Sequence, residues 1–274
     1  MGSAEKENAI YPHYTENDVY KELLGWAESA GITVKYAGVD VCKKSIGTSY
    51  LGTDAHIVTM RSDYTYKSIR EATLTFAHEI GHTLTKTFYH YALKQYIKEA
   101  PVFKYFQEAD ANILSVAFYI LAEMSANQKI YNEGKSQIMS DIENREIPHY
   151  NDVFEELVSL AEQAGITVEY ARGEDISTAN SFDARPNVNR VTIASDYQVP
   201  QMACFRLAHE IAHTLTKTFY PYVTQYSENI SGEKLMHYEF QEAHADNIGV
   251  GICALATMIA KQKEKTSKRQ APNT

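Results

Sequence analysis

Two stretches of this chain contain the pattern His-Glu-x-x-His, a spacing that is typical of helical metal sites. They are "AHEIGH", with His78, Glu79 and His82, and "AHEIAH", with His209, Glu210 and His213. Residues four apart lie on the same face of an α-helix, so each pair of imidazoles can point at one ion. The glutamate between them leans towards the same side, where it can act on a water molecule as a general base. The pattern predicts a metal site in each half of the chain, and zinc suits neutral imidazole ligands.

A catalytic zinc ion takes three protein ligands and keeps one position open. Glu108 and Glu242 are the candidates for the third ligand, because each stands at the start of an apolar, helix-like segment downstream of the motif. One helical turn further stand Asn112 and Asp246, either of which could hydrogen-bond the outer nitrogen of a ligating histidine and fix its tautomer. A carboxylate raises ligand basicity more than an amide does, so the two sites could differ in affinity. We expect one Zn²⁺ per half and two per chain.

Other residues near the motifs are weaker candidates. Tyr89 and Tyr220 follow the last motif histidine by two helical turns, where a phenol could stabilise an oxyanion. Because the chain has 20 tyrosines, packing explains any single one better. His244 would point away from the metal on a helix and is expected at the surface.

The two motifs belong to a longer internal repeat. "NDVYKELLGWAESAGITVKYA" from Asn17 returns as "NDVFEELVSLAEQAGITVEYA" from Asn151, and "FQEADANI" from Phe106 returns as "FQEAHADNI" from Phe240. The repeat is too long for a solenoid and indicates two homologous domains. We expect a first metallopeptidase-like domain at 9–126, a linker at 127–146, a second such domain at 147–262 and a flexible tail at 263–274.

Each unit is expected to be α+β. Apolar positions at helical spacing predict helices over 17–30 and 151–164, which end at Gly31 and Gly165. Alternating β-branched stretches predict strands at "ITVKYA", "ITVEYA", "AHIVTM" and "NRVTIAS", and "SIGTSYLG" is predicted to belong to a hairpin. The motif helix and a last apolar helix, which carries the candidate glutamate, follow these strands.

The motif phrases, each with its downstream context "EADAN" or "EAHAD", resemble the ImmA/IrrE family of zinc metallopeptidases. The resemblance covers the core of each unit and implies a zincin-like arrangement of an opening helix, a small antiparallel sheet, the motif helix and the ligand helix. The residues that it implies are the ligands His78, His82 and Glu108 with the base Glu79, and the ligands His209, His213 and Glu242 with the base Glu210.

Family members cleave helix-turn-helix repressors of phages and mobile elements. The resemblance therefore implies a transcriptional repressor as the protein substrate. This chain departs from the family in two ways. Family members usually carry one such domain, and Ala212 replaces the glycine that is more usual in the motif, which would crowd the approach to the second ion.

Composition narrows the function classes further. The chain has 274 residues, 44% of them hydrophobic, a net charge of -9 and a pI near 5.6, which argues against direct nucleic-acid binding. No apolar run is expected to span a bilayer, and the polar N-terminus lacks the apolar stretch of a secretory signal. Three cysteines without a CxxC pair suit a reduced compartment, so a cytoplasmic location without a membrane is expected.

The leading hypothesis is a zinc-dependent endopeptidase that hydrolyses a peptide bond in a protein substrate. The alternative is a non-catalytic, zinc-containing internal pseudo-dimer of the two domains that binds and regulates a partner protein. A structural zinc ion would need a fourth protein ligand, and no obvious one is present in the sequence. In a mixed case, one unit cuts while the other positions the substrate. The sequence leaves open the substrate, the dominant unit and the packing of the units.

Overall fold

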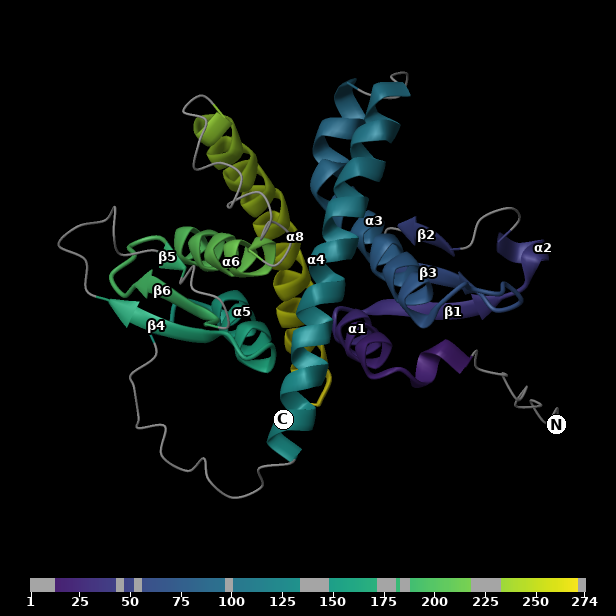
Figure 1. The fold of residues 1–274 in the computed structure, drawn as a ribbon, viewed down its shortest axis with the longest axis horizontal. Coiled ribbons are helices and arrows are strands. Elements are labelled where there is room, and N and C mark those ends of the chain that lie inside the picture. The colour runs from purple at the N-terminus through teal and green to yellow at the C-terminus, as the bar shows by residue number, and fades with distance from the viewer. Residues whose placement is uncertain are drawn as a thin grey trace.

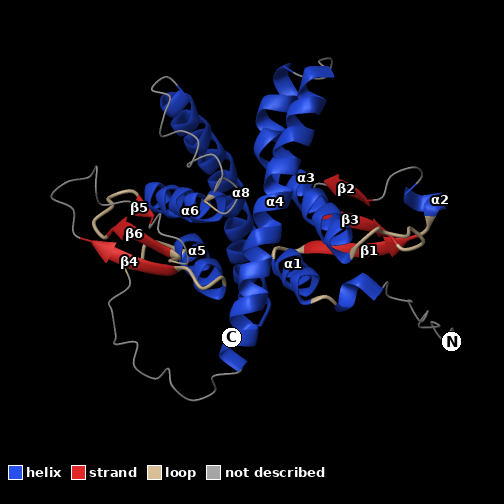
Figure 2. Cartoon of the chain, in the orientation of Figure 1, coloured by secondary structure: helices blue, strands red, loops and turns tan. Residues whose placement is uncertain are grey.

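The protein has a mostly helical α+β fold with two small sheets (Figures 1 and 2). The computed structural model describes residues 13–42, 47–51, 56–96, 101–133, 148–171, 181–182, 188–217 and 233–270. Within these ranges it does not describe the side chains of residues 41–42, 49–51, 86–96, 101–106, 133, 181–182 and 233–240.

The first half begins with a short 3-10 helix, η1 (His13–Glu16), and the helix α1 (Asp18–Ser29). The Asn17 side chain caps α1 by accepting hydrogen bonds from the backbone N–H groups of Val19 and Tyr20. The helix ends before Gly31, whose φ of 75° suits glycine. The remaining elements are β1 (Ile32–Ala37), α2 (Val39–Cys42), β2 (Gly47–Leu51), β3 (His56–Arg61), α3 (Ile69–Tyr96) and α4 (Pro101–Glu133).

The second half follows the same order of a helix, three strands and two long helices. Asn151 caps α5 (Asp152–Gln163) by accepting a hydrogen bond from the backbone N–H of Phe154, and Gly165 follows the helix with a φ of 70°. The remaining elements are β4 (Thr167–Ala171), β5 (Ser181–Phe182), β6 (Arg190–Ala194), α6 (Pro200–Thr216) and α8 (Glu233–Gln270). The helices α1 and α5 and the strands predicted from the sequence are thus present, with ends shifted by one or two residues, whereas α4 and α8 are longer than expected.

Both sheets are mixed, so the expectation of antiparallel sheets is wrong. Their strand orders are β1-β3-β2 and β4-β6-β5. The central strand is parallel to the first and antiparallel to the second, with Ile32 opposite His56 and Gly47 opposite Met60. The reason is topological. After β1 the chain crosses to the far edge of the sheet, and the β2–β3 hairpin then brings β3 back into the middle in the direction of β1.

The two halves share one hydrophobic core, and α4 and α8 pack together along its centre (Figure 1). Buried residues from α1, α3 and α4 form one cluster with those from α5, α6 and α8. At the contact, a Cβ on Gly251 of α8 would lie 2.2 Å from Leu114 Cδ2 of α4. The glycine therefore leaves room for the Leu114 side chain between these two helices.

The long helices extend further than the sequence indicated. α4 continues to Glu133, into the expected linker at 127–146, and α8 continues to Gln270, through most of the expected tail at 263–274. Near these ends two glutamines reach the opposite half: the Gln128 side chain lies beside Gly165, and the Gln262 side chain lies beside Gly31. Residues 134–147 and 271–274 lie outside the described residues.

One helix is long and apolar enough to cross a membrane by its length and composition alone, although no such run was expected. It is the Gln241–Gln270 part of α8, with a mean hydropathy of 1.3 over its most apolar window. In the fold 56% of that window is buried inside the protein, as in a core helix.

The glycine that ends α1 should be essential to its half of the fold. We expect Gly31→Ala to destabilise the protein by about 1–2 kcal/mol, because alanine resists the left-handed conformation, and its Cβ would lie 3.2 Å from Gln262 Oε1. Gly25→Ala is the control: no atom lies within 4 Å of its Cβ position inside α1, so we expect a gain of about 0.5–1 kcal/mol. Urea denaturation measures both changes, and equal effects would contradict this account.

Candidate metal centre

The motif histidines lie on α3 and α6, where one turn of helix separates the two members of each pair. The ring centroids of His78 and His82 are 4.5 Å apart with an interplanar angle of 87°, and those of His209 and His213 are 4.6 Å apart at 84°. These edge-on pairs present their Nε2 atoms to the same side of the helix. The spacing in the sequence predicted this convergence.

A glutamate from the following long helix meets each histidine pair. Glu108 of α4 places Oε2 3.4 Å from His78 Nε2 and 3.5 Å from His82 Nε2. Glu242 of α8 places Oε2 3.3 Å from His209 Nε2 and Oε1 3.3 Å from His213 Nε2. The six ligands proposed from the sequence are therefore brought together as two groups of three.

The separations between the ligand atoms fit a tetrahedral metal ion. Bonds of about 2.1 Å in tetrahedral geometry hold neighbouring ligand atoms about 3.4 Å apart. The His–Glu separations in both groups are close to this value, and the Nε2 atoms of His209 and His213 are 3.0 Å apart. Among the described residues each group has three ligand side chains and no fourth. Each group could hold a metal ion with one coordination position open.

The two motif glutamates are buried beside these groups. Glu79 is 8% exposed and Glu210 is 7% exposed. Burial raises the pKa of Glu210 to about 7; the charges of His209 and Arg206 oppose this shift, and that of Glu242 adds to it. A carboxyl group with a pKa near neutrality can both accept and return a proton at physiological pH.

Glu79 packs against the first residue of β2. A Cβ on Gly47 would lie 2.9 Å from Glu79 Cγ, so the glycine leaves the space that this side chain fills. Sequence reasoning missed this contact. The only signal was a glycine inside a strand pattern, which often marks a close approach of another group.

In the second half a carboxylate holds the outer nitrogen of the first motif histidine, and among the described residues the matching contact to His78 is not made. His209 Nδ1 lies 2.9 Å from Asp246 Oδ1. Asn112, at the matching place on α4, is exposed, and within the described part of the first half it makes no hydrogen bond to His78. Burial also lowers the pKa of His213, which favours the neutral imidazole that binds metals. The sequence suggested such a contact for Asn112 and for Asp246, and in the described residues only Asp246 makes it.

Ala212 does not crowd the second group. Its methyl group is fully buried in the core, and the His–Glu separations of the second group are no longer than those of the first. In the first half Gly81 provides the close contact, 3.2 Å from its Cβ position to Ala111 Cα. In the second half Gly249 of α8 provides it, 3.1 Å from its Cβ position to the backbone nitrogen of His209. The glycine at the close helix contact thus belongs to the motif helix α3 in the first half and to the following helix α8 in the second half.

We therefore expect Gly249→Ala to destabilise the protein by about 1–3 kcal/mol, because α6 and α8 would have to separate at His209. Glu242 would move with α8, so zinc binding at the second group should weaken as well. Thermal denaturation and zinc binding measure the two effects. The matched control is Ser115→Ala at the corresponding place on α4, where a smaller loss is expected. Unchanged stability in Gly249→Ala would show that the contact is not tight.

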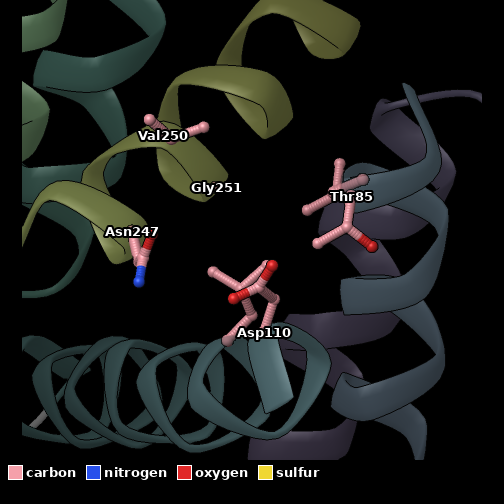
Figure 3. Close-up of a pocket in the computed structure, with 7 residues that line it drawn as sticks. Thr85, Asp110, Asn247, Val250 and Gly251 are labelled. Carbon is pink, nitrogen blue, oxygen red and sulfur yellow. The ribbon is translucent and has the colours of Figure 1, made fainter. Parts of the chain in front are cut away.

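A separate cavity lies between the halves, with a volume of about 40 Å³. Figure 3 shows Thr85 and Asp110 of the first half facing Asn247, Val250 and Gly251 of α8 across it. Its lining includes none of the six metal-ligand candidates. A space of this size holds a few water molecules at most, so it is not a substrate site.

Three further residues considered in the sequence, Tyr89, Tyr220 and His244, are not among the residues of the two metal-ligand groups. The side chain of Tyr89 lies outside the described residues, as does the whole of Tyr220, so their suggested role is untested. His244, expected at the surface, is half-buried on α8.

Comparison of the chain with family models, with curated proteins and with solved structures finds no match. The resemblance to the ImmA/IrrE family stays a prediction from the motif residues.

Proposed function

We propose that the protein is a zinc-dependent endopeptidase with one zinc site in each half. One observation carries the proposal: in both halves, the side-chain atoms of two histidines and one glutamate are separated as the ligands of a tetrahedral zinc ion would be. The three-ligand composition of each group supports a catalytic role, because structural zinc sites are closed by a fourth protein ligand.

We also propose that the two halves are homologous domains, each with a motif helix and a ligand helix, that form an internal pseudo-dimer. The repeated sequence phrases and the equal strand orders support this origin. The shared core around α4 and α8 supports a single unit, rather than two independent domains on a linker.

In the proposed mechanism, bound zinc supplies a Lewis acid that polarises a carbonyl group and activates water. His78, His82 and Glu108 hold the ion in the first half, and the matching three residues hold it in the second. Glu79 or Glu210 accepts a proton as water attacks the scissile carbonyl carbon, and then donates it to the leaving amine. Their burial keeps bulk water away from this proton transfer. By the resemblance in sequence, a transcriptional repressor in the cytoplasm is the proposed substrate.

The test is the amount of zinc per chain, measured by elemental analysis of the purified protein after reconstitution. We expect two zinc ions in the unaltered chain, one in His78→Ala, one in His209→Ala and none in the double variant, because each substitution removes one of the three candidate ligands of its group. The control is His149→Ala, which changes a surface histidine paired with Glu155 and should retain two. A chain without zinc would refute the proposal, and it would equally refute the zinc-containing partner-binding alternative.

A further inference from the structure

The two proposed metal sites differ in the contacts behind their ligands. In the second group, Asp246 Oδ1 lies within hydrogen-bond distance, 2.9 Å, of His209 Nδ1, the ring nitrogen that faces away from the metal position. Asn112 occupies the same place relative to Glu108 as Asp246 does relative to Glu242, one helical turn further along. It carries an amide instead of a carboxylate, and although both side chains are exposed, only Asp246 contacts a histidine of its group among the described residues.

We propose that the second site binds zinc more tightly than the first, and that Asp246 is the positioning residue responsible for the difference. This inference rests on the proposed zinc-binding function and adds the order in which zinc occupies the two sites. When zinc is scarce, the second half is loaded and the first half is not.

The chemistry of the outer contact explains the difference. An ionised carboxylate only accepts hydrogen bonds, so His209 must carry its proton on Nδ1 and present the lone pair of Nε2 to the ion. An amide can donate or accept and therefore does not select one tautomer of a histidine beside it. The carboxylate also makes the imidazole a better donor to the metal. Loss of such an outer partner typically lowers metal affinity about 10–100-fold.

Burial acts in the same direction. The side chains of His209, His213 and Glu242 are 7%, 8% and 33% exposed. Those of His78, His82 and Glu108 are 21%, 12% and 46% exposed. The second set is packed more closely, so its side chains lose less freedom when they bind an ion. The first set must be ordered to a greater extent by the ion itself.

The experiment is a titration of the metal-free full-length protein with zinc in competition with a chromophoric chelator. We expect two phases whose dissociation constants differ by about 10–100-fold. His209→Ala should remove the tighter phase and His78→Ala the weaker one. Equal affinities, or a tighter first site, would overturn the inference but leave the zinc proposal standing. The absence of any zinc binding would instead refute the proposed function.

Reciprocal variants test the role of Asp246. Asp246→Asn should weaken the tight phase about 10–100-fold, and Asn112→Asp should tighten the weak phase. The second variant gains affinity, a result that misfolding would not produce. Glu264→Gln, which removes an exposed carboxylate from the same helix α8, is the charge control and should change neither phase. If Asp246→Asn and Asn112→Asp leave both phases unchanged, Asp246 does not determine the difference.

Discussion

Replacement of both Glu79 and Glu210 by glutamine should abolish peptide hydrolysis while two zinc ions stay bound. Glutamine keeps the size of the side chain but cannot accept the proton that the attacking water must lose. General-base catalysis of this kind accounts for about 10²–10⁴-fold in rate, so the double variant should lose at least that factor. The measurement is cleavage of a mixture of fluorogenic peptides, with the zinc content of the same samples measured by elemental analysis.

The single variants assign the activity to the two halves. At limiting zinc, Glu210→Gln alone should remove most of the activity, because the second half is then the loaded one. Glu28→Gln, on the exposed side of α1, is the control and should be fully active. Hydrolysis that persists unchanged in the zinc-loaded double variant would show that these glutamates are not the catalytic bases.

Removal of zinc should lower the thermal stability of the protein substantially. Each ion connects two helices, α3 with α4 or α6 with α8, and binds only where these helices are folded together. At free zinc about 1,000 times the dissociation constant, each site adds about 4 kcal/mol. For a chain of this size each kcal/mol raises Tm by about 2–4 °C, so we expect a loss of roughly 10 °C or more per site.

Differential scanning calorimetry with and without a strong chelator makes this measurement. A variant with both His78→Ala and His209→Ala is the matched control, since its Tm should not depend on zinc. If the unaltered chain has the same Tm in both conditions, the two groups do not bind zinc in the folded state.

Features that depend on residues close in sequence were predicted correctly, whereas several features that depend on distant residues were not. The ends of α1 and α5 were predictable because an asparagine cap and a glycine with positive φ act within a few residues. The convergence of the two histidines in each His-Glu-x-x-His pattern was predictable for the same reason, because one helical turn brings them together. The candidates for the third ligand, Glu108 and Glu242, could be chosen from the sequence because each stands in a repeated phrase at the start of an apolar segment.

Several features depended on residues that are distant in sequence. The mixed order of each sheet was missed because alternation in a strand does not specify which neighbour it pairs with, or in which direction. The full lengths of α4 and α8 were underestimated because their last turns look polar and solvated in the sequence. They nevertheless continue as helix to Glu133 and Gln270, and just before the expected tail the Gln262 side chain lies beside Gly31 of the opposite half.

The sequence by itself determined the elements, the two motif helices and the candidate ligands, because local spacing and capping fix what each segment can form. Only the tertiary structure decided that Glu108 and Glu242 reach the histidines and that the halves share one core. It also decided that Asp246 contacts His209, whereas in the described part of the chain Asn112 makes no such contact with His78. These results depend on how closely two helices approach each other. That distance is set by the packing of residues from both helices, for example where Gly249 meets the backbone of His209 and where Gly251 meets the Leu114 side chain.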